Sequence, residues 1–189
     1  ACAPGDQFVV RRYSPMLTIG GGTVLDNLPS KHRPGDSTTI ELLRRLEGGT
    51  LKDRVALLTA ASGSRGAEEV HLQHRTFSNS THLRSVANSL ADAGCLAIAQ
   101  ETPLIVLDSE VVNTLEETII EAVRRQHAEH PLMPGLSKSA VAATLPRHLP
   151  EVILDALLDR LITAQRLDGG SNTLALPEHN VTLSEPQEH

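Results

Sequence analysis

Hydrophobic positions recur every three or four residues along most of this 189-residue chain, which is the spacing of amphipathic helices. In the first half, the pattern predicts four helices: from about Ser37 to the pair Gly48-Gly49, Lys52 to Ala61, Ala67 to His74, and from the cap Ser78-Asn79-Ser80 to Ala93. Capping of the first helix is expected from Ser37, Thr38 and Thr39 together with Glu41. Apolar runs at residues 95–98 and 104–107 then flank a turn and predict a hairpin.

The second half repeats the order of three helices followed by a hairpin. Helices are predicted over Val112–Glu129, Lys138–Leu145 and Pro150–Ala164, and short strands over Arg166–Leu167 and Thr173–Leu176, around a turn at residues 168–172. Helices followed by a hairpin that packs on them are typical of the winged helix-turn-helix. The sequence therefore predicts a mainly α fold with small β-hairpins, arranged as two tandem winged helices.

A different pattern precedes the helices. Residues 4–26 read PGDQFVVRRYSPMLTIGGGTVLD and predict two strands, the second interrupted by the triplet Gly20-Gly21-Gly22. An isolated hairpin is at best marginally stable in water, so we expect these strands to complete a sheet that lies upstream of Ala1. Glycines within a strand mark a bulge or a close backbone approach. A phosphate-binding loop is the alternative, but no helix follows whose N-terminus would complete it.

The amino-acid composition limits the kinds of core and of binding site that this chain can form. Aromatic residues make up 2% of the chain, so the cores must consist of Leu, Val, Ile and Ala, and single-strand binding modules built on aromatic stacking are disfavoured. Cys2 and Cys95 form no CxxC motif, and no signal peptide or membrane-spanning run is visible, so we expect a cytoplasmic protein with no membrane partner. Histidine pairs at 71/74 and 127/130 lack the further ligands of a zinc site, and we expect no metal.

Charge is distributed unevenly. Residues 1–35 carry a net charge of +2, and the rest of the chain carries −8, giving −6 in total. An acidic body opposes non-specific binding to a phosphate backbone, so any nucleic-acid contact should be local or made by a neighbouring domain. The candidate contacts are Arg75, His82 and Arg84, in or just before the presumed recognition helix of the first winged helix, and Arg12 in the first strand. An ordinary solvated face is the alternative for Arg75, His82 and Arg84, and a solvated or edge-protecting charge is the alternative for Arg12.

The corresponding helix of the second winged helix carries Glu151, Asp155 and Asp159 against Arg160. Its acidic surface would repel phosphates, so we expect a spacer or protein-docking role there. No serine, cysteine or histidine lies in a recognisable nucleophile context, and we expect no catalytic residue in the chain.

Residues 4–26, the stretch HPLMPG at 130–135 and the ending AQRLDGGSNTLALPEHNVTL at 164–183 together resemble the bacterial selenocysteine-specific translation elongation factor family, SelB. The resemblance implies five segments: the last strands of a β-barrel domain (1–27), a linker (28–36), a first winged helix (37–108), a second winged helix (109–183) and a tail (184–189). It further implies that the chain links a body that binds GTP and tRNA to winged helices that read an mRNA hairpin.

Several consequences follow from this resemblance. Neither GxxxxGK[ST] nor an NKxD-like motif is present, so we expect no enzyme activity and no cofactor in this chain, with GTP and Mg²⁺ bound by another domain of the parent translational GTPase. Selenocysteyl-tRNA, the mRNA hairpin and the ribosome are the implied partners of the full-length protein, with weak or no RNA binding by this piece. The alternative is a tandem winged-helix DNA-binding regulator or a chromosome-partitioning protein, which would need a basic recognition surface.

Overall fold

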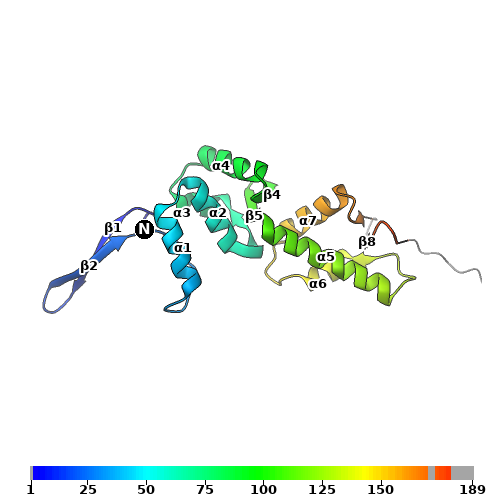
Figure 1. Ribbon diagram of the computed structural model, residues 1–189, viewed down its shortest axis with the longest axis horizontal. Coiled ribbons are helices and arrows are strands. Elements are labelled where there is room, and N and C mark those ends of the chain that lie inside the picture. Colours follow the sequence, from blue (N-terminus) through cyan, green and yellow to red (C-terminus); the bar gives the residue numbers. More distant parts are fainter. Residues whose placement is uncertain (1, 170–172, 180–189) are drawn as a thin grey trace, which may run out of the picture. The chain divides into compact units, whose positions relative to one another are not determined.

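The computed structural model describes residues 2–169 and 173–179, and the chain divides into two compact units with a boundary between Asp108 and Ser109 (Figure 1). The first unit holds a β-hairpin and a helical module with a small sheet. The second unit holds a helical module with a sheet of the same strand order. The predicted fold class, mainly α with small antiparallel hairpins, is confirmed.

The first unit begins with an antiparallel hairpin of β1 (Gln7–Arg12) and β2 (Leu17–Thr23). Its register shifts between Val10 and Arg11, because Ile19 falls between their partners on β2. One extra residue on one strand is a β-bulge, which bends the strand and increases its twist. The bulge lies next to the glycine triplet, as the sequence pattern suggested.

Two glycines of the triplet lie close to Phe8 across the hairpin. A Cβ atom on Gly21 would lie 2.6 Å from the carbonyl oxygen of Phe8, and one on Gly22 would lie 2.9 Å from the Phe8 ring. The contact at Gly21 is with backbone, so a side chain there would push the strands apart. The contact at Gly22 is with the tip of the exposed Phe8 ring, which would have to turn away. The prediction that the triplet marks a bulge and a close approach is confirmed.

The hairpin buries none of its own strand residues. Every residue of β1 and β2 is exposed, including Val9 and Ile19. The three aromatic side chains of the chain are also outside the cores: Phe8 is 47% exposed, Tyr13 96% and Phe77 77%. Both cores are therefore aliphatic, as the composition predicted.

The helical module of the first unit consists of four α-helices, a short 3₁₀ turn and a three-stranded sheet. In order these are α1 (Ser37–Gly48), α2 (Leu51–Ser62), η1 (Gly63–Arg65), β3 (Ala67–Glu68), α3 (Glu69–Thr76), α4 (Ser80–Asp92), β4 (Leu96–Glu101) and β5 (Leu104–Asp108). The strands are antiparallel in the order β3-β5-β4. Helix α2, strand β3, helices α3 and α4, and the hairpin β4–β5 form the winged helix, and α1 is an additional helix packed on α2.

Leu46, Val55, Leu58, Leu72, Leu83 and Leu104 are among the residues that fill the core of this module. Each fully buried leucine contributes about 1.5–3 kcal/mol relative to an exposed one, so the periodic apolar face of each helix holds the module together. Local capping fixes where the helices start. In α2, the Thr50 side chain accepts from the Asp53 amide and the Asp53 carboxylate accepts from the Thr50 amide, which is a full capping box.

Two sequence predictions in this module are wrong in detail. Asp36, and not the Ser37–Thr39 group, caps α1: its carboxylate accepts from the Thr38 amide at 3.1 Å. The helix predicted from Ala67 starts at Glu69, because Ala67 and Glu68 pair with β5 as strand β3. A two-residue strand has no internal periodicity, and its partner β5 is distant in the sequence.

The second unit repeats the winged-helix order. It contains α5 (Ser109–Glu129), β6 (Leu136–Ser137), α6 (Lys138–Thr144), α7 (Glu151–Thr163), β7 (Asp168–Gly169) and β8 (Thr173–Ala175). The strand order β6-β8-β7 is that of the first module. Strand β6 was not predicted, and the first strand of the wing lies at β7, just after the predicted Arg166–Leu167. Residues 170–172 of the predicted turn fall outside the described residues.

Leu115, Ile119, Val123, Val141, Ile153, Leu157, Leu161 and Leu174 are buried in this second core. Gly135 lets the chain pass close to β8, since a Cβ atom there would lie 2.4 Å from the carbonyl oxygen of Leu174. None of the helices within residues 2–169 and 173–179 combines the length and the apolar character needed to cross a bilayer.

Candidate nucleic-acid interface

In the first unit, α3 and α4 form the helix-turn-helix, whose second helix enters the groove in proteins of this fold that bind nucleic acid. The Asn79 side chain caps α4 by accepting from the His82 amide at 2.8 Å, which confirms the predicted cap. The turn holds Phe77 in the left-handed conformation with φ of 52°. Phe77, which precedes α4 in the sequence, is exposed.

The outward face of α4 is polar and almost uncharged. Leu83, Ala87 and Leu90 point into the core, and the residues on the opposite side are exposed: Thr81, His82, Ser85, Asn88 and Ser89. Hydroxyl, amide and imidazole groups can contact phosphates or base edges, but they do not supply the charge that drives affinity. The predicted candidate His82 lies on this face.

Arg84 is already paired with a carboxylate. Its guanidinium donates to Glu69 of α3 through Nε at 3.0 Å and also through Nη2, and Ser80 donates to the same carboxylate. Hydrogen bonds from Arg84 and then Ser80 hold the pKa of Glu69 below its usual value. Arg84 Nη1 also donates to the carbonyl oxygen of Glu101 at 2.9 Å, which ties α4 to the wing.

Arg75 is also paired, and more deeply buried. Its Nε and Nη2 atoms donate to the two oxygens of Asp26 at 2.9 and 2.5 Å, with side-chain exposures of 14% for Arg75 and 5% for Asp26. Burial alone would raise the pKa of Asp26, but the hydrogen bonds from Arg75 and the Leu28 amide outweigh it and the pKa is lowered. Arg75 thus joins α3 to the segment that leaves the hairpin.

The remaining candidate, Arg12, is exposed at the end of β1, opposite Leu17 of β2. The four predicted residues therefore lie on three elements: α3, α4 and β1. His82 and Arg84 share a helix, but residues two apart do not face the same side. The structure does not gather them into one basic patch.

The second module presents an acidic face at the equivalent position. Glu151, Asp155 and Asp159 are exposed on α7, and Lys138 of α6 pairs with Asp155 at 2.5 Å and Glu151 at 3.2 Å. The hydrogen bonds to Asp155 and then Glu151 raise the pKa of Lys138. One lysine does not offset three carboxylates, so the face stays negative.

The same contrast holds for whole units. The first unit contains eleven Lys and Arg residues and eleven Asp and Glu residues, whereas the second contains six and twelve. The chain's net charge of −6 therefore lies entirely in the second unit. The negative charge of the second unit would repel the phosphates of an RNA.

His127, near the C-terminal end of α5, forms a pair with His179, which follows β8 in the sequence. The rings of His127 and His179 stack with centroids 3.7 Å apart and an interplanar angle of 11°, and His179 Nε2 lies 3.1 Å from the Met133 carbonyl oxygen. Burial, and then the charge of His179, lower the pKa of His127. Within residues 2–169 and 173–179, no three His, Cys, Asp or Glu residues are placed to hold a metal ion.

The arrangement of both units defines a class of protein: two winged helix-turn-helix modules in tandem, preceded by a β-hairpin. Residues 120–176 match the family model described as elongation factor SelB, winged helix, which represents the second winged helix of that factor. Over 183 residues, 97% of its length, the chain is 24% identical to a selenocysteine-specific elongation factor from Desulfomicrobium baculatum. The chain spans 29% of that relative's length. The predicted resemblance to a SelB winged-helix fragment is therefore confirmed.

The sequence indicates Arg75 and Arg84 as candidates but does not reveal their carboxylate partners. Asp26 lies 49 residues before Arg75, and Glu69 lies 15 residues before Arg84. Glu69 is in the first turn of α3 and could equally have been a helix-capping charge. No spacing rule connects residues so far apart, so both pairs are visible only in the structure.

Proposed function

We propose that this chain is part of a selenocysteine-specific elongation factor that delivers selenocysteyl-tRNA to the ribosome at recoded UGA codons. In this proposal, the chain links the body that binds GTP and tRNA to the winged helices that bind the mRNA hairpin, in the cytoplasm. The observation that carries it is the similarity across 97% of the chain to a protein of that name, joined to a fold of a hairpin and two winged helices.

The geometry supports a linking role better than an RNA-reading role. Helix α5 has 21 residues and hence a length of about 32 Å at 1.5 Å per residue, which is a rigid span within the second module. Arg75 of α3 and Arg84 of the first recognition helix are both paired with carboxylates, and the second recognition helix is acidic. We infer that the chain binds RNA weakly by itself, and that tight mRNA reading belongs to other modules of the parent protein.

The exposed apolar residues of the hairpin also support the proposal. Its strands expose Val9, Val10, Leu17 and Ile19, which leaves apolar surface unburied. Apolar strands with free edges pair with other strands, so we infer that β1 and β2 complete a β-barrel domain of the parent protein. GTP and Mg²⁺ would bind in a further domain of that parent, because the chain has no phosphate-cradling motif.

The alternative, a DNA-binding regulator or chromosome-partitioning protein with tandem winged helices, gains nothing from either comparison. It would require a basic recognition surface on at least one module. This alternative also does not explain the exposed hairpin of β1 and β2.

The test is reconstitution of the full-length parent with GTP and selenocysteyl-tRNA on an mRNA with its hairpin. Deleting residues 37–183 should leave GTP hydrolysis and selenocysteyl-tRNA binding intact and abolish UGA decoding. A parent gene without a GTPase domain upstream of Ala1, or a deletion variant that decodes UGA normally, would refute the proposal.

A further inference from the structure

The segment that leaves the hairpin is held directly by the helices of the first winged helix. Arg75 of α3 forms its two hydrogen bonds with Asp26, and Arg54 of α2 donates through Nη2 to the carbonyl oxygen of Leu25 at 2.8 Å. These contacts join residues 29 and 49 positions apart. Two different helices therefore hold two successive residues of one short segment.

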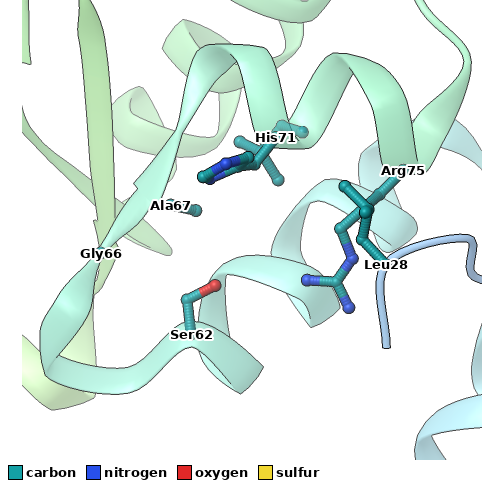
Figure 2. A pocket seen from close by; sticks show the side chains of 7 residues that line it. Leu28, Ser62, Gly66, Ala67, His71 and Arg75 are labelled. Carbon is teal, nitrogen blue, oxygen red and sulfur yellow. The ribbon is translucent and has the colours of Figure 1, made fainter. Parts of the chain in front are cut away.

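The segment is also fixed from within. The Leu28 amide donates to Asp26 at 3.1 Å, and the Asn27 side chain donates to the carbonyl oxygen of Cys2 at 3.2 Å. Leu28 lines a cavity of about 240 Å³ together with Leu72 and Arg75 of α3, and Figure 2 shows Leu28 and the Arg75 guanidinium at the same side of this cavity.

Burial changes abruptly after this segment. Residues 24–27 are partly buried, whereas residues 28–35 are exposed. Residues 28–36 were predicted to be the linker between the strands and the first winged helix. The contacts at Leu25 and Asp26 precede that linker, so the hairpin is attached to α2 and α3 before the exposed stretch begins.

We propose that Asp26, Arg75 and Arg54 form a joint, the Asp26 joint, that fixes the hairpin's domain in one orientation relative to the first winged helix. The exposed residues 29–35 then act as a connecting loop and not as a hinge. A bidentate pair between a guanidinium and a carboxylate restricts direction as well as distance, which suits an orienting role. Arg75 is accordingly a positioning residue for the domains and not an RNA contact.

The functional consequence rests on the proposed function. If the hairpin belongs to the tRNA-binding body, the Asp26 joint sets the direction in which the winged helices project from that body. The structural claim needs neither tRNA nor GTP. It can therefore fail or succeed separately from the assignment to an elongation factor.

The experiment measures the hairpin's orientation in the 189-residue chain by electron-spin distance measurements. Spin labels are placed at Thr18→Cys in β2 and Asn88→Cys in α4, both exposed, after replacing the exposed Cys2 and Cys95 by serine. The labelled chain without further substitutions should give one narrow distance distribution. Asp26→Asn should broaden it about twofold or more, since flexibly connected domains move independently by default.

Three variants make the result decisive. Arg75→Lys keeps the charge but loses the two-point geometry, and it should broaden the distribution even if Asp26→Asn unfolds the module. Glu69→Gln breaks an ion pair inside the module and should leave the width unchanged. Insertion of Gly-Ser-Gly-Ser after Ser30 lengthens the exposed loop and should also leave it unchanged.

The proposed Asp26 joint would be overturned if the labelled chain without further substitutions already gave a broad distance distribution. It would also be overturned if neither Asp26→Asn nor Arg75→Lys changed the width. Broadening by the loop insertion alone would overturn it too, because residues 29–35 would then set the orientation. Circular dichroism of each variant establishes that the helices remain folded.

Discussion

Replacing Asp26 by asparagine tests how much a buried ion pair contributes to the first unit. The substitution keeps the size of the side chain and removes its charge, so the Arg75 guanidinium stays 14% exposed without a counter-ion. Removing one partner of a buried pair costs about 3–5 kcal/mol, and hydrogen bonds to charged groups contribute about 1.5–3 kcal/mol. Because the amide introduced by Asp26→Asn retains one acceptor oxygen, we expect a loss of about 2–4 kcal/mol in the unfolding free energy of the first unit.

Glu116 in the second unit provides a matched comparison. Its carboxylate is 8% exposed and accepts from Arg160 Nε at 2.9 Å and from Arg166 Nη1 at 3.4 Å. Those arginines are 51% and 41% exposed, so water can solvate them once the charge is gone. Glu116→Gln should therefore cost about 1 kcal/mol or less, the range of exposed pairs.

Native-state hydrogen exchange can separate the two effects within one sample. Amides of α2 and α3 report the first unit, and amides of α5 report the second. Asp26→Asn should lower protection in α2 and α3 and leave α5 unchanged, and Glu116→Gln should do the reverse, more weakly. Equal losses for the two variants would refute the reasoning that exposure of the cation sets the cost.

The pH dependence gives an independent check on Asp26. Its folded pKa is lowered from 3.8, so its contribution is fully present above pH 3.8 and is lost as the pH falls through the folded pKa. Acid melts of the parent chain should therefore show an extra loss of first-unit stability below pH 3.8 that Asp26→Asn lacks. Parallel curves for the two proteins would contradict the assignment.

Three further predictions concern packing and titration. The pKa of His127 in the folded state is below 6.5, so the second unit should lose stability as the pH falls from 6.5 through that lower value. Thermal melts of His127→Leu should lack this loss. If the melting temperature of His127→Leu depended on pH as it does in the unsubstituted chain, the His127–His179 stack would be excluded as the source. Gly135→Ala should destabilise the second unit by about 1–3 kcal/mol in urea unfolding, since its Cβ would overlap Leu174, and a neutral effect would contradict the close approach. Leu83→Ala should cost the first unit about 2–5 kcal/mol by calorimetry, and a loss under about 1 kcal/mol would mean that Leu83 is not in its core.

The sequence predicts the helices well because each carries its own signal. The apolar positions of α4, Leu83, Ala87 and Leu90, repeat at helical spacing, and Asn79 is a capping residue directly before them. The glycine triplet was also interpreted correctly, since glycine within a strand pattern has few structural explanations. Local chemistry was enough for these features.

Features that depend on the tertiary fold were missed. Strands β3 and β6 have two residues each and exist only through pairing with β5 and β8. Arg75 was predicted as a nucleic-acid contact because it precedes the recognition helix, and its buried partner Asp26 could not be inferred from a distance of 49 residues. For Arg84, the sequence revealed the charge but not Glu69, which neutralises it.

The central claim is that this chain links two parts of an elongation factor and does not itself read mRNA. Fluorescence anisotropy of a labelled mRNA hairpin, titrated with the 189-residue chain at physiological salt, tests it most directly. We expect a Kd weaker than about 1 μM, the non-specific range, with no preference over a scrambled RNA. A Kd of about 10 nM with clear preference for the hairpin would contradict it.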